Sequence, residues 1–229
     1  MISLMSDRMV RNVQILTDSF LPLLKAGIQF TVPLTILSFI IGVGIAFAVA
    51  IVRVMEIRPF AGIARFYVWI IRGTPLLVQL FIIFYGLPSI GITLDALVSA
   101  VIGFSLSVGA YSSEIIRAAI ESISKGQWEA AHALGMTKVQ TLKHIILPQA
   151  VRVAIPPLSN SFISLVKDTS LAAAITVSEL FQVAQQITAR TYEPLWLYTE
   201  AAVIYLLFCS GLTVLQSKME MRFGRHLAK

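Results

Sequence analysis

The 229-residue chain is 57% hydrophobic and only 13% charged, with a mean hydropathy of +0.82. Soluble domains carry about 25% charged residues, so this composition excludes a soluble protein and predicts a membrane protein of one compact domain. The net charge of +6 does not indicate nucleic-acid binding, because the basic residues stand at the ends of apolar runs. The single cysteine, Cys209, excludes an internal disulfide and a cysteine-based zinc site, and no other metal site is expected.

The apolar runs predict an all-α membrane protein with about five transmembrane helices. Residues 1–19 are polar and mixed, and we expect an external N-terminal segment there. The first apolar run is too long for the core of a signal peptide, so it is expected to remain in the mature chain. The expected spans cover about 28–52, 75–86, 94–119, 150–166 and 195–215.

The second span is short if it starts at Pro75, so it either continues to Ile90 or begins before the proline with a kink. Thr74 suits the N-cap of a helix whose first turn holds Pro75. The preceding aromatic segment, residues 66–69, is typical of the membrane surface.

Two further local signals concern the second half of the chain. The pair Pro156-Pro157 is expected to interrupt the fourth span, because proline removes a backbone donor. Residues 176–179, Thr-Val-Ser-Glu, have the spacing of a capping box and predict a short amphipathic helix that ends at about Thr188.

A polar, amphipathic loop, residues 127–148, separates the third and fourth spans. Gly135 suits the left-handed residue that ends a first short helix, and Thr137 with Gln140 forms a capping box for a second. Pro148 is expected to stop this second helix. Its apolar residues recur at helical spacing on one face: Val139, Leu142, Ile145 and Ile146. Two interpretations remain open: a surface helix in the lipid headgroups or a docking helix seated in a groove of a partner.

The spacing within this loop resembles the EAA loop of permease subunits of ABC importers. The matching positions are Glu129, Ala130, Ala131, Gly135, Ile145, Leu147 and Pro148. The resemblance implies a type I ABC importer transmembrane domain over residues 20–217, with the loop as a coupling helix on an ATP-hydrolysing partner and 218–229 as a basic cytoplasmic tail. The chain has no G-x-x-x-x-G-K-[ST] loop, so ATP is expected on the partner and no catalysis or cofactor in this chain.

The basic residues predict the orientation of the spans. One set of loops, including the tail, holds twelve Lys and Arg residues and the other set holds four. Because cytoplasmic loops are enriched in Lys and Arg, the N-terminus is expected outside and the C-terminus and the 127–148 loop inside. Glu114 and Arg117 lie three apart on the third span, and we interpret them as a structural pair.

Polar side chains on apolar backgrounds are candidates for the substrate path: Gln79, Asn160, Ser161, Lys167, Asp168 and Thr169. Charges there are costly, about 2.5–3.5 kcal/mol at the bilayer centre. Asp168 would meet the amino group of a substrate. Alternatively, Lys167 reaches the membrane surface and Asp168 caps a helix, while Gln79 and Asn160 make interhelical hydrogen bonds.

Three segments resemble the permeases of polar amino-acid importers: 72–79, which begins with the structural motif Arg72, Gly73, Thr74 and Pro75, then 147–150 and 167–171. Residues 156–171 are most similar to L-cystine importer permeases. Members that handle basic amino acids tend to have Glu where Ser161 stands, so a neutral or zwitterionic substrate fits better.

The resemblance implies import of a polar amino acid, L-cystine, across a bacterial cell membrane. It also implies two ATP-binding subunits, a second permease copy or sister permease, an external solute-binding protein and surrounding lipid, but no nucleic acid. An importer for glutamine or a basic amino acid is the alternative. A self-sufficient secondary transporter or channel is a different class, but no internal repeat is visible. An intramembrane hydrolase is disfavoured, because no histidine shares a span with Asp168.

Overall fold

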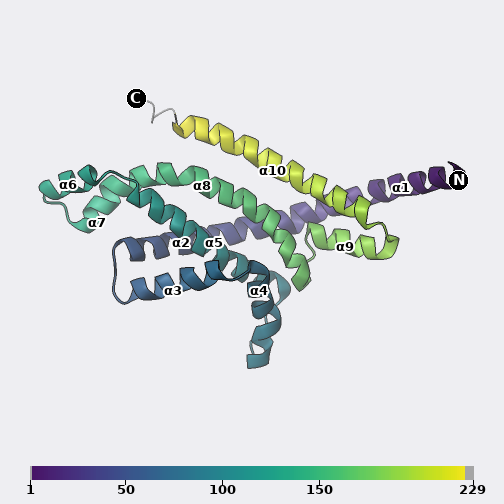
Figure 1. Cartoon of the computed structure of the whole chain (residues 1–229), viewed down its shortest axis with the longest axis horizontal. Coiled ribbons are helices and arrows are strands. Elements are labelled where there is room, and N and C mark those ends of the chain that lie inside the picture. Colours follow the sequence, from purple (N-terminus) through teal and green to yellow (C-terminus); the bar gives the residue numbers. More distant parts are fainter. Residues whose placement is uncertain (1, 225–229) are drawn as a thin grey trace. The chain divides into compact units, whose positions relative to one another are not determined.

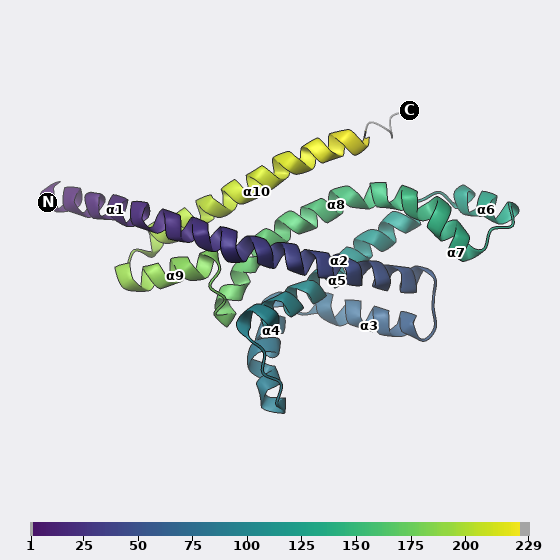
Figure 2. The ribbon, with the colours of Figure 1, turned by 180° about the vertical axis from the view of Figure 1, so that it is seen from behind.

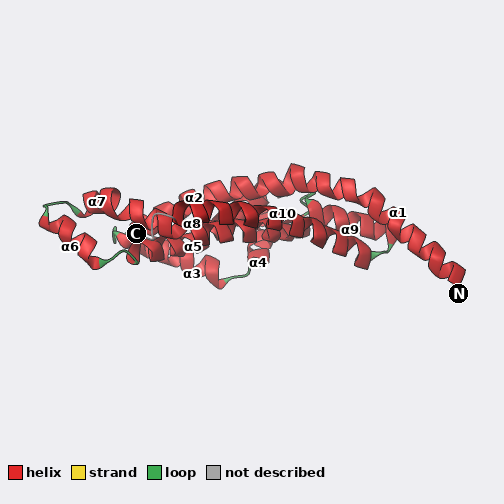
Figure 3. Cartoon of the chain, turned by 90° about the horizontal axis from the view of Figure 1, so that it is seen from above, coloured by secondary structure: helices red, strands yellow, loops and turns green. Residues whose placement is uncertain are grey.

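The computed structural model describes the backbone of residues 2–224 and the side chains of residues 9–218. Within that range every regular element is a helix (Figure 1), as the red ribbons and green loops of Figure 3 show. The part of the expected basic tail after Lys218 lies outside the described side chains. The expectation of an all-helical chain is confirmed.

The α-helices are α1 (Ile2–Ala26), α2 (Val32–Val54), α3 (Phe60–Gly73), α4 (Leu76–Phe81), α5 (Ala96–Glu121), α6 (Lys125–Ala133), α7 (Lys138–Thr141), α8 (Leu147–Asp168), α9 (Leu180–Thr191) and α10 (Pro194–Gly224). Three π-helical turns, η1 (Gly27–Thr31), η2 (Ile82–Gly86) and η4 (Leu142–Ile146), and two 3₁₀ segments, η3 (Leu87–Ile90) and η5 (Thr169–Ile175), join some of them. No further helical element occurs among the described residues.

The chain divides into two compact units, each assembled from three separate stretches of sequence. Unit 1 consists of Met1–Leu37, Leu77–Gly103 and Ile163–Thr213. Unit 2 consists of Ser38–Leu76, Phe104–Phe162 and Val214–Lys229. The 127–148 loop therefore belongs to unit 2, and the Lys167–Asp168 pair belongs to unit 1.

Three stretches of the described chain are long and apolar enough to cross a membrane: Met9–Val54, Ala96–Glu121 and Pro194–Lys218. The number of candidate spans rises to four if the bent pair of helices, Phe60–Gly73 and Leu76–Ile90, forms one broken span. We expected about five. The remaining long helix, α8, has 22 residues and is not among these stretches.

The first helical stretch begins earlier than the sequence suggested. Residues 1–19 were expected as a polar segment before the first span, but the chain is helical from Ile2, and α1, η1 and α2 follow one another without a loop (Figure 2). The polar residue Arg11 of α1 contacts another part of the chain: its guanidinium donates to the carbonyl of Thr191 at 3.0 Å and lies 3.6 Å from the carboxylate of Glu193. These contacts bind α1 to the end of α9 and the residues that follow it.

The helix that follows Pro75 continues to Ile90, in agreement with one of the two alternatives for the second span. Leu76 to Ile90 is helical throughout, and the aromatic segment 66–69 lies on a separate helix, α3. The hydroxyl of Thr74 donates to the carbonyl of Ile70 at 2.8 Å, so it binds the end of α3.

Each of the three π-helical turns of the described chain ends two residues before a proline. In each turn the residue before the proline donates its N–H five positions back: Val32 to Gly27, Leu87 to Ile82 and Leu147 to Leu142. A proline ring clashes with the carbonyl four positions earlier and removes a donor, and a widened turn accommodates this loss. The prolines concerned are Pro33, Pro88 and Pro148.

The expectation that Pro148 stops a helix is therefore wrong. The preceding π-turn absorbs the proline, and the side-chain amide of Gln149 donates to the carbonyl of Ile145 at 2.8 Å. The expected interruption at Pro156-Pro157 is also absent, because α8 continues through both residues. There the hydroxyl of Ser159 donates to the carbonyl of Ile155 at 2.9 Å.

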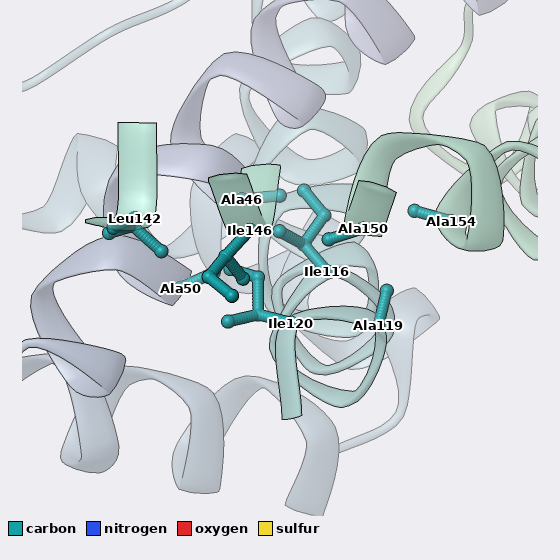
Figure 4. Close-up of a cluster of buried hydrophobic side chains, with 9 residues drawn as sticks. All are labelled: Ala46, Ala50, Ile116, Ala119, Ile120, Leu142, Ile146, Ala150 and Ala154. Carbon is teal, nitrogen blue, oxygen red and sulfur yellow. The ribbon is translucent and has the colours of Figure 1, made fainter. Parts of the chain in front are cut away.

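The core of unit 2 forms where α2, α5 and the η4–α8 stretch meet. Nine apolar side chains are buried together (Figure 4): Ala46, Ala50, Ile116, Ala119, Ile120, Leu142, Ile146, Ala150 and Ala154. Five of them are alanines, which lets the helix backbones approach closely, as is typical of membrane helix packing. The loop helix is thus anchored in the same core as two spans.

The core of unit 1 forms between α1, α9 and α10. Leu23, Leu180, Ala184, Ala201 and Ile204 are buried together there. The hydroxyl of Ser19 on α1 donates to the carboxylate of Glu200 on α10 at 2.5 Å. A short helix that does not span a membrane, α9, is therefore fixed between two long ones.

Candidate functional site

The 127–148 loop has the local geometry that its sequence predicts. Helix α6 ends before Gly135, which takes the left-handed conformation with φ +74°. Thr137 caps α7: its hydroxyl accepts from the N–H of Gln140 at 3.3 Å, and the Gln140 side chain accepts from the N–H of Thr137 at 2.8 Å. The predicted capping box and the predicted break at Gly135 are confirmed.

One face of the second loop helix packs into the core of unit 2. Leu142 and Ile146 are buried and Ile145 is half-buried. Val139 is 62% exposed, so it lies outside this core. Val139 lies one turn closer to the tip of the loop, and only the residues from Leu142 onward reach the core.

Two large apolar side chains of the loop face outward. Leu134 is 82% exposed and Val139 is 62% exposed, and they flank the exposed Gly135. Glu129 and Ala130 are exposed as well, whereas Ala131 is buried. Large exposed apolar residues on a polar loop mark a surface that contacts either a partner protein or the membrane. We call Glu129, Leu134 and Val139 the docking face.

A cluster of arginines surrounds one glutamate in unit 2. The predicted Glu114–Arg117 pair is confirmed at 2.8 Å, but Glu114 also binds Arg53 directly, and Arg72 lies 3.8 Å from its carboxylate. The Arg72 guanidinium stacks over the ring of Tyr111, 5.4 Å from its centroid. Arg72, the first residue of the predicted structural motif, thus joins α3 to α5.

The candidates for the substrate path are distributed over both units. Gln79 on α4 and the run Lys167 to Thr169 belong to unit 1, while Asn160 and Ser161 on α8 belong to unit 2. Gln79 and Thr169 are buried, Ser161 is half-buried, and Asn160 is exposed. The side-chain oxygen of Asn160 accepts from the amide of Gln216 at 2.9 Å, so this residue makes the interhelical bond named as an alternative.

Lys167 and Asp168 end α8, and both are exposed. The alternative in which Asp168 caps the following helix requires a side-chain hydrogen bond to η5, and Asp168 makes no such cap bond there. The neighbouring hydroxyls turn back instead, with Thr169 donating to Val166 and Ser170 to Lys167, each at 2.7 Å. Among the described residues neither Lys167 nor Asp168 forms an ion pair within 4.0 Å, so both charges are available to a ligand.

We expect Asp168→Asn to lower the rate of substrate uptake about tenfold without changing assembly of the transporter. A hydrogen bond to a charged group contributes about 1.5–3 kcal/mol, and the amide keeps the shape while losing the charge. Uptake into vesicles, normalised to the amount of complex, measures the effect. Asp95→Asn is the matched control, since Asp95 caps α5 through the N–H of Val98 at 2.9 Å and Asn caps equally well. Equal uptake by both variants would contradict a role in the path.

The expected capping box at 176–179 is wrong, because the helix begins three residues later. Thr176 takes a left-handed conformation with φ +63°, and Glu179 is the N-cap of α9, accepting from the N–H of Gln182 at 2.7 Å. Sequence reasoning missed that Glu179 is completely buried. The available sequence signal was that Glu179 stands directly before an apolar run. The capping-box spacing of Thr176 and Glu179 led us to place the N-cap at Thr176 instead.

Helices long and apolar enough to cross a membrane, joined by a polar loop, define a multi-pass membrane protein. Residues 38–225 match the family described as binding-protein-dependent transport system inner membrane component. The chain is 56% identical over 213 residues, 93% of this chain and 91% of the relative, to the L-cystine transport system permease protein TcyB of Bacillus subtilis (strain 168).

Two further comparisons also match proteins of amino-acid ABC transporters. The chain is 35% identical over 218 residues, 93% of this chain and 99% of the relative, to the probable glutamine ABC transporter permease protein GlnM of the same organism. It resembles a solved amino acid ABC transporter crystallised with histidines, with a TM-score of 0.85 and 35% identity, covering 90% of this chain and 96% of that one. The chain therefore belongs to the binding-protein-dependent transport system inner membrane components, the permeases of ABC importers, and has their type I fold.

Proposed function

We propose that the chain is the membrane-spanning subunit of an ABC importer that carries L-cystine across a bacterial cell membrane. The observation that carries the substrate is the 56% identity to an L-cystine permease over 93% of the chain. Ser161 supports it, since a neutral hydroxyl on α8 offers no carboxylate to hold a cationic side chain. Lys167 and Asp168 offer one charge of each sign, which complements the carboxylate and ammonium groups of a zwitterionic amino acid.

The proposed subunit has five spans, of which α8 is the fourth, with its N-terminus outside and its C-terminus in the cytosol. The excess of Lys and Arg on one set of loops supports this orientation, which puts the docking face on the side where ATP is available. The exposed Leu134 and Val139 support a partner that covers them. Two ATP-binding subunits supply the energy, a second permease completes the channel, and an external binding protein delivers the solute.

The mechanism follows from how the loop is attached. Leu142 and Ile146 share one core with Ala46 and Ala50 of α2 and with Ile120 of α5. Interiors are close-packed, so a displacement of the loop moves these helices with it rather than being absorbed. Closure of the partner on ATP then biases the spans toward one of two states. The permease itself contributes no bond-breaking step, and ATP is held by the partner.

Reconstitution tests the proposal. The permease, its ATP-binding subunit and its binding protein are expected to import labelled L-cystine into proteoliposomes only when ATP is enclosed. Excess unlabelled L-cystine should abolish the signal, and L-glutamine or L-arginine in the same excess should not. Preference for either of the latter would establish the alternative amino acid. ATP-independent uptake by the permease alone would establish a secondary transporter or channel.

A further inference from the structure

Glu179 is the one fully buried carboxylate among the described side chains of unit 1, with an exposed fraction of 0%. Its Oε1 accepts from the N–H of Gln182 at 2.7 Å, and its Oε2 accepts from the hydroxyl of Tyr205 at 2.5 Å. The hydroxyl of Thr31 lies 3.5 Å from the same Oε2. No described cation pairs with it, so neutral donors and the start of α9 satisfy its charge.

These donors come from elements far apart in the sequence. Thr31 lies in the π-turn η1 between α1 and α2, Tyr205 lies on α10, and Gln182 lies on α9. The N–H of Leu180 also reaches the hydroxyl of Thr31, at 3.4 Å. The carboxylate of Glu179 is therefore the point at which three parts of unit 1 are joined by polar contacts.

The same network touches the proposed substrate path. The N–H groups of Thr176 and Val177, just before Glu179, donate to the carbonyls of Ala173 and Ala172 in η5, each at 3.1 Å. The η5 segment begins at Thr169, directly after Lys167 and Asp168. Thr169 is completely buried, as are Ala172 and Ile175 further along η5. The hydroxyl of Tyr85 donates to the carbonyl of Ala174 at 3.2 Å and holds the other end of η5.

Side chains of α9 and α10 pack closely against the π-turn that holds Thr31. A Cβ added at Gly27, in the same π-turn as Thr31, would lie 2.7 Å from the ring of Phe208 and 3.1 Å from the side chain of Leu180. Buried polar contacts in such an environment fix one arrangement, because an unsatisfied partner costs about 1–3 kcal/mol. The end of η5, the segment that follows Asp168, is therefore held next to Glu179 and its polar contacts.

We propose that Glu179 is a positioning residue for transport, which together with Tyr205 fixes the end of η5 and so holds the Lys167–Thr169 segment in place. This role deepens the proposed function and rests on it, since it requires that the segment lines the substrate path. Loss of the hydroxyl of Tyr205, or of the negative charge of Glu179, frees the segment while the spans remain folded. ATP hydrolysis by the partner continues, but fewer substrate molecules cross for each ATP consumed.

The test compares Glu179→Gln, Tyr205→Phe and the double variant in the reconstituted complex. Substrate uptake and binding-protein-stimulated ATP hydrolysis are measured on the same vesicles, and their ratio is compared with the wild type. We expect each single variant to lower the ratio at least fivefold. The double variant should lower it no further than the more severe single one, because both residues act through one chain of contacts.

The matched control is Glu200→Gln. Glu200 lies on α10, as Tyr205 does, and accepts a hydrogen bond from Ser19, but it is not among the contacts of η5 described above. We expect its ratio to stay within twofold of the wild type. Thermal unfolding and co-purification with the ATP-binding subunit show how far each variant remains folded.

Two outcomes would overturn the positioning role. One is an unchanged ratio in Glu179→Gln and Tyr205→Phe, and the other is a parallel loss of uptake, hydrolysis and folded protein, as expected of a merely structural residue. The ratio is taken with whichever of L-cystine, L-glutamine and L-arginine the wild type imports, so a wrong substrate alone does not affect it. A wild-type complex that imports none of them refutes the proposed function itself.

Discussion

Glu114→Gln is expected to lower the free energy of unfolding of the permease by about 3 kcal/mol, the lower end of the range for breaking a buried ion pair. The carboxylate is 20% exposed and lies among the side chains of Arg53, Arg72 and Arg117. Removing its charge leaves three guanidinium groups close together and poorly hydrated. For a chain of this length the midpoint of thermal unfolding should fall by about 6–12 °C.

Glu121→Gln is the control for this prediction. Glu121 also binds Arg117, at 2.6 Å, but its side chain is 55% exposed. Pairs exposed in this way contribute about 0–1 kcal/mol. Thermal unfolding of both purified variants in the same detergent makes the comparison, and a midpoint for Glu114→Gln no lower than for Glu121→Gln would show that the arginine cluster does not depend on the carboxylate.

The double variant Leu134→Asp/Val139→Asp is expected to weaken binding of the ATP-binding subunit several hundredfold. Buried anchors of an interface contribute about 2 kcal/mol each when they are hot spots, and every 1.4 kcal/mol is a factor of about ten in Kd. The affinity is measured with the permease in nanodiscs. The fold should survive, because the two side chains are 82% and 62% exposed.

Leu134→Met/Val139→Ile is the matched control, because it changes the same two positions and keeps the surface apolar. We expect its affinity to lie within about fivefold of the wild type. If the aspartate variant binds the ATP-binding subunit as tightly as this control does, the docking face lies elsewhere on the permease.

The sequence predicted those features that depend on local chemistry. The break at Gly135 and the Thr137–Gln140 capping box follow from backbone preference and a three-residue spacing, and both are present. The Glu114–Arg117 pair follows from helix periodicity alone. Arg53 and Arg72 could not be predicted as its partners, because their contacts with Glu114 depend on how α2 and α3 pack against α5.

The errors share one cause, the assumption that proline and threonine act by local rules. Pro148 was expected to end a helix, but a π-turn absorbs it. Thr176 had the spacing of a cap, but Glu179 takes that role because tertiary contacts with Thr31 and Tyr205 outweigh the local preference. The burial of Glu179 depends on three separated segments, and no pattern within one segment indicates it.

The π-turns have a consequence for the phase of the helices on either side. In unit 2 the side chains of Leu142, Ile146, Ala150 and Ala154 are buried at intervals of four. In a regular α-helix such intervals drift by about 40° at every step, so the stripe would wind away from its neighbours. The wide turn at Leu142–Ile146 takes up part of that drift. Deleting a single residue there would convert the wide turn to a regular one, so the loop helix would meet the core of unit 2 at a different angle.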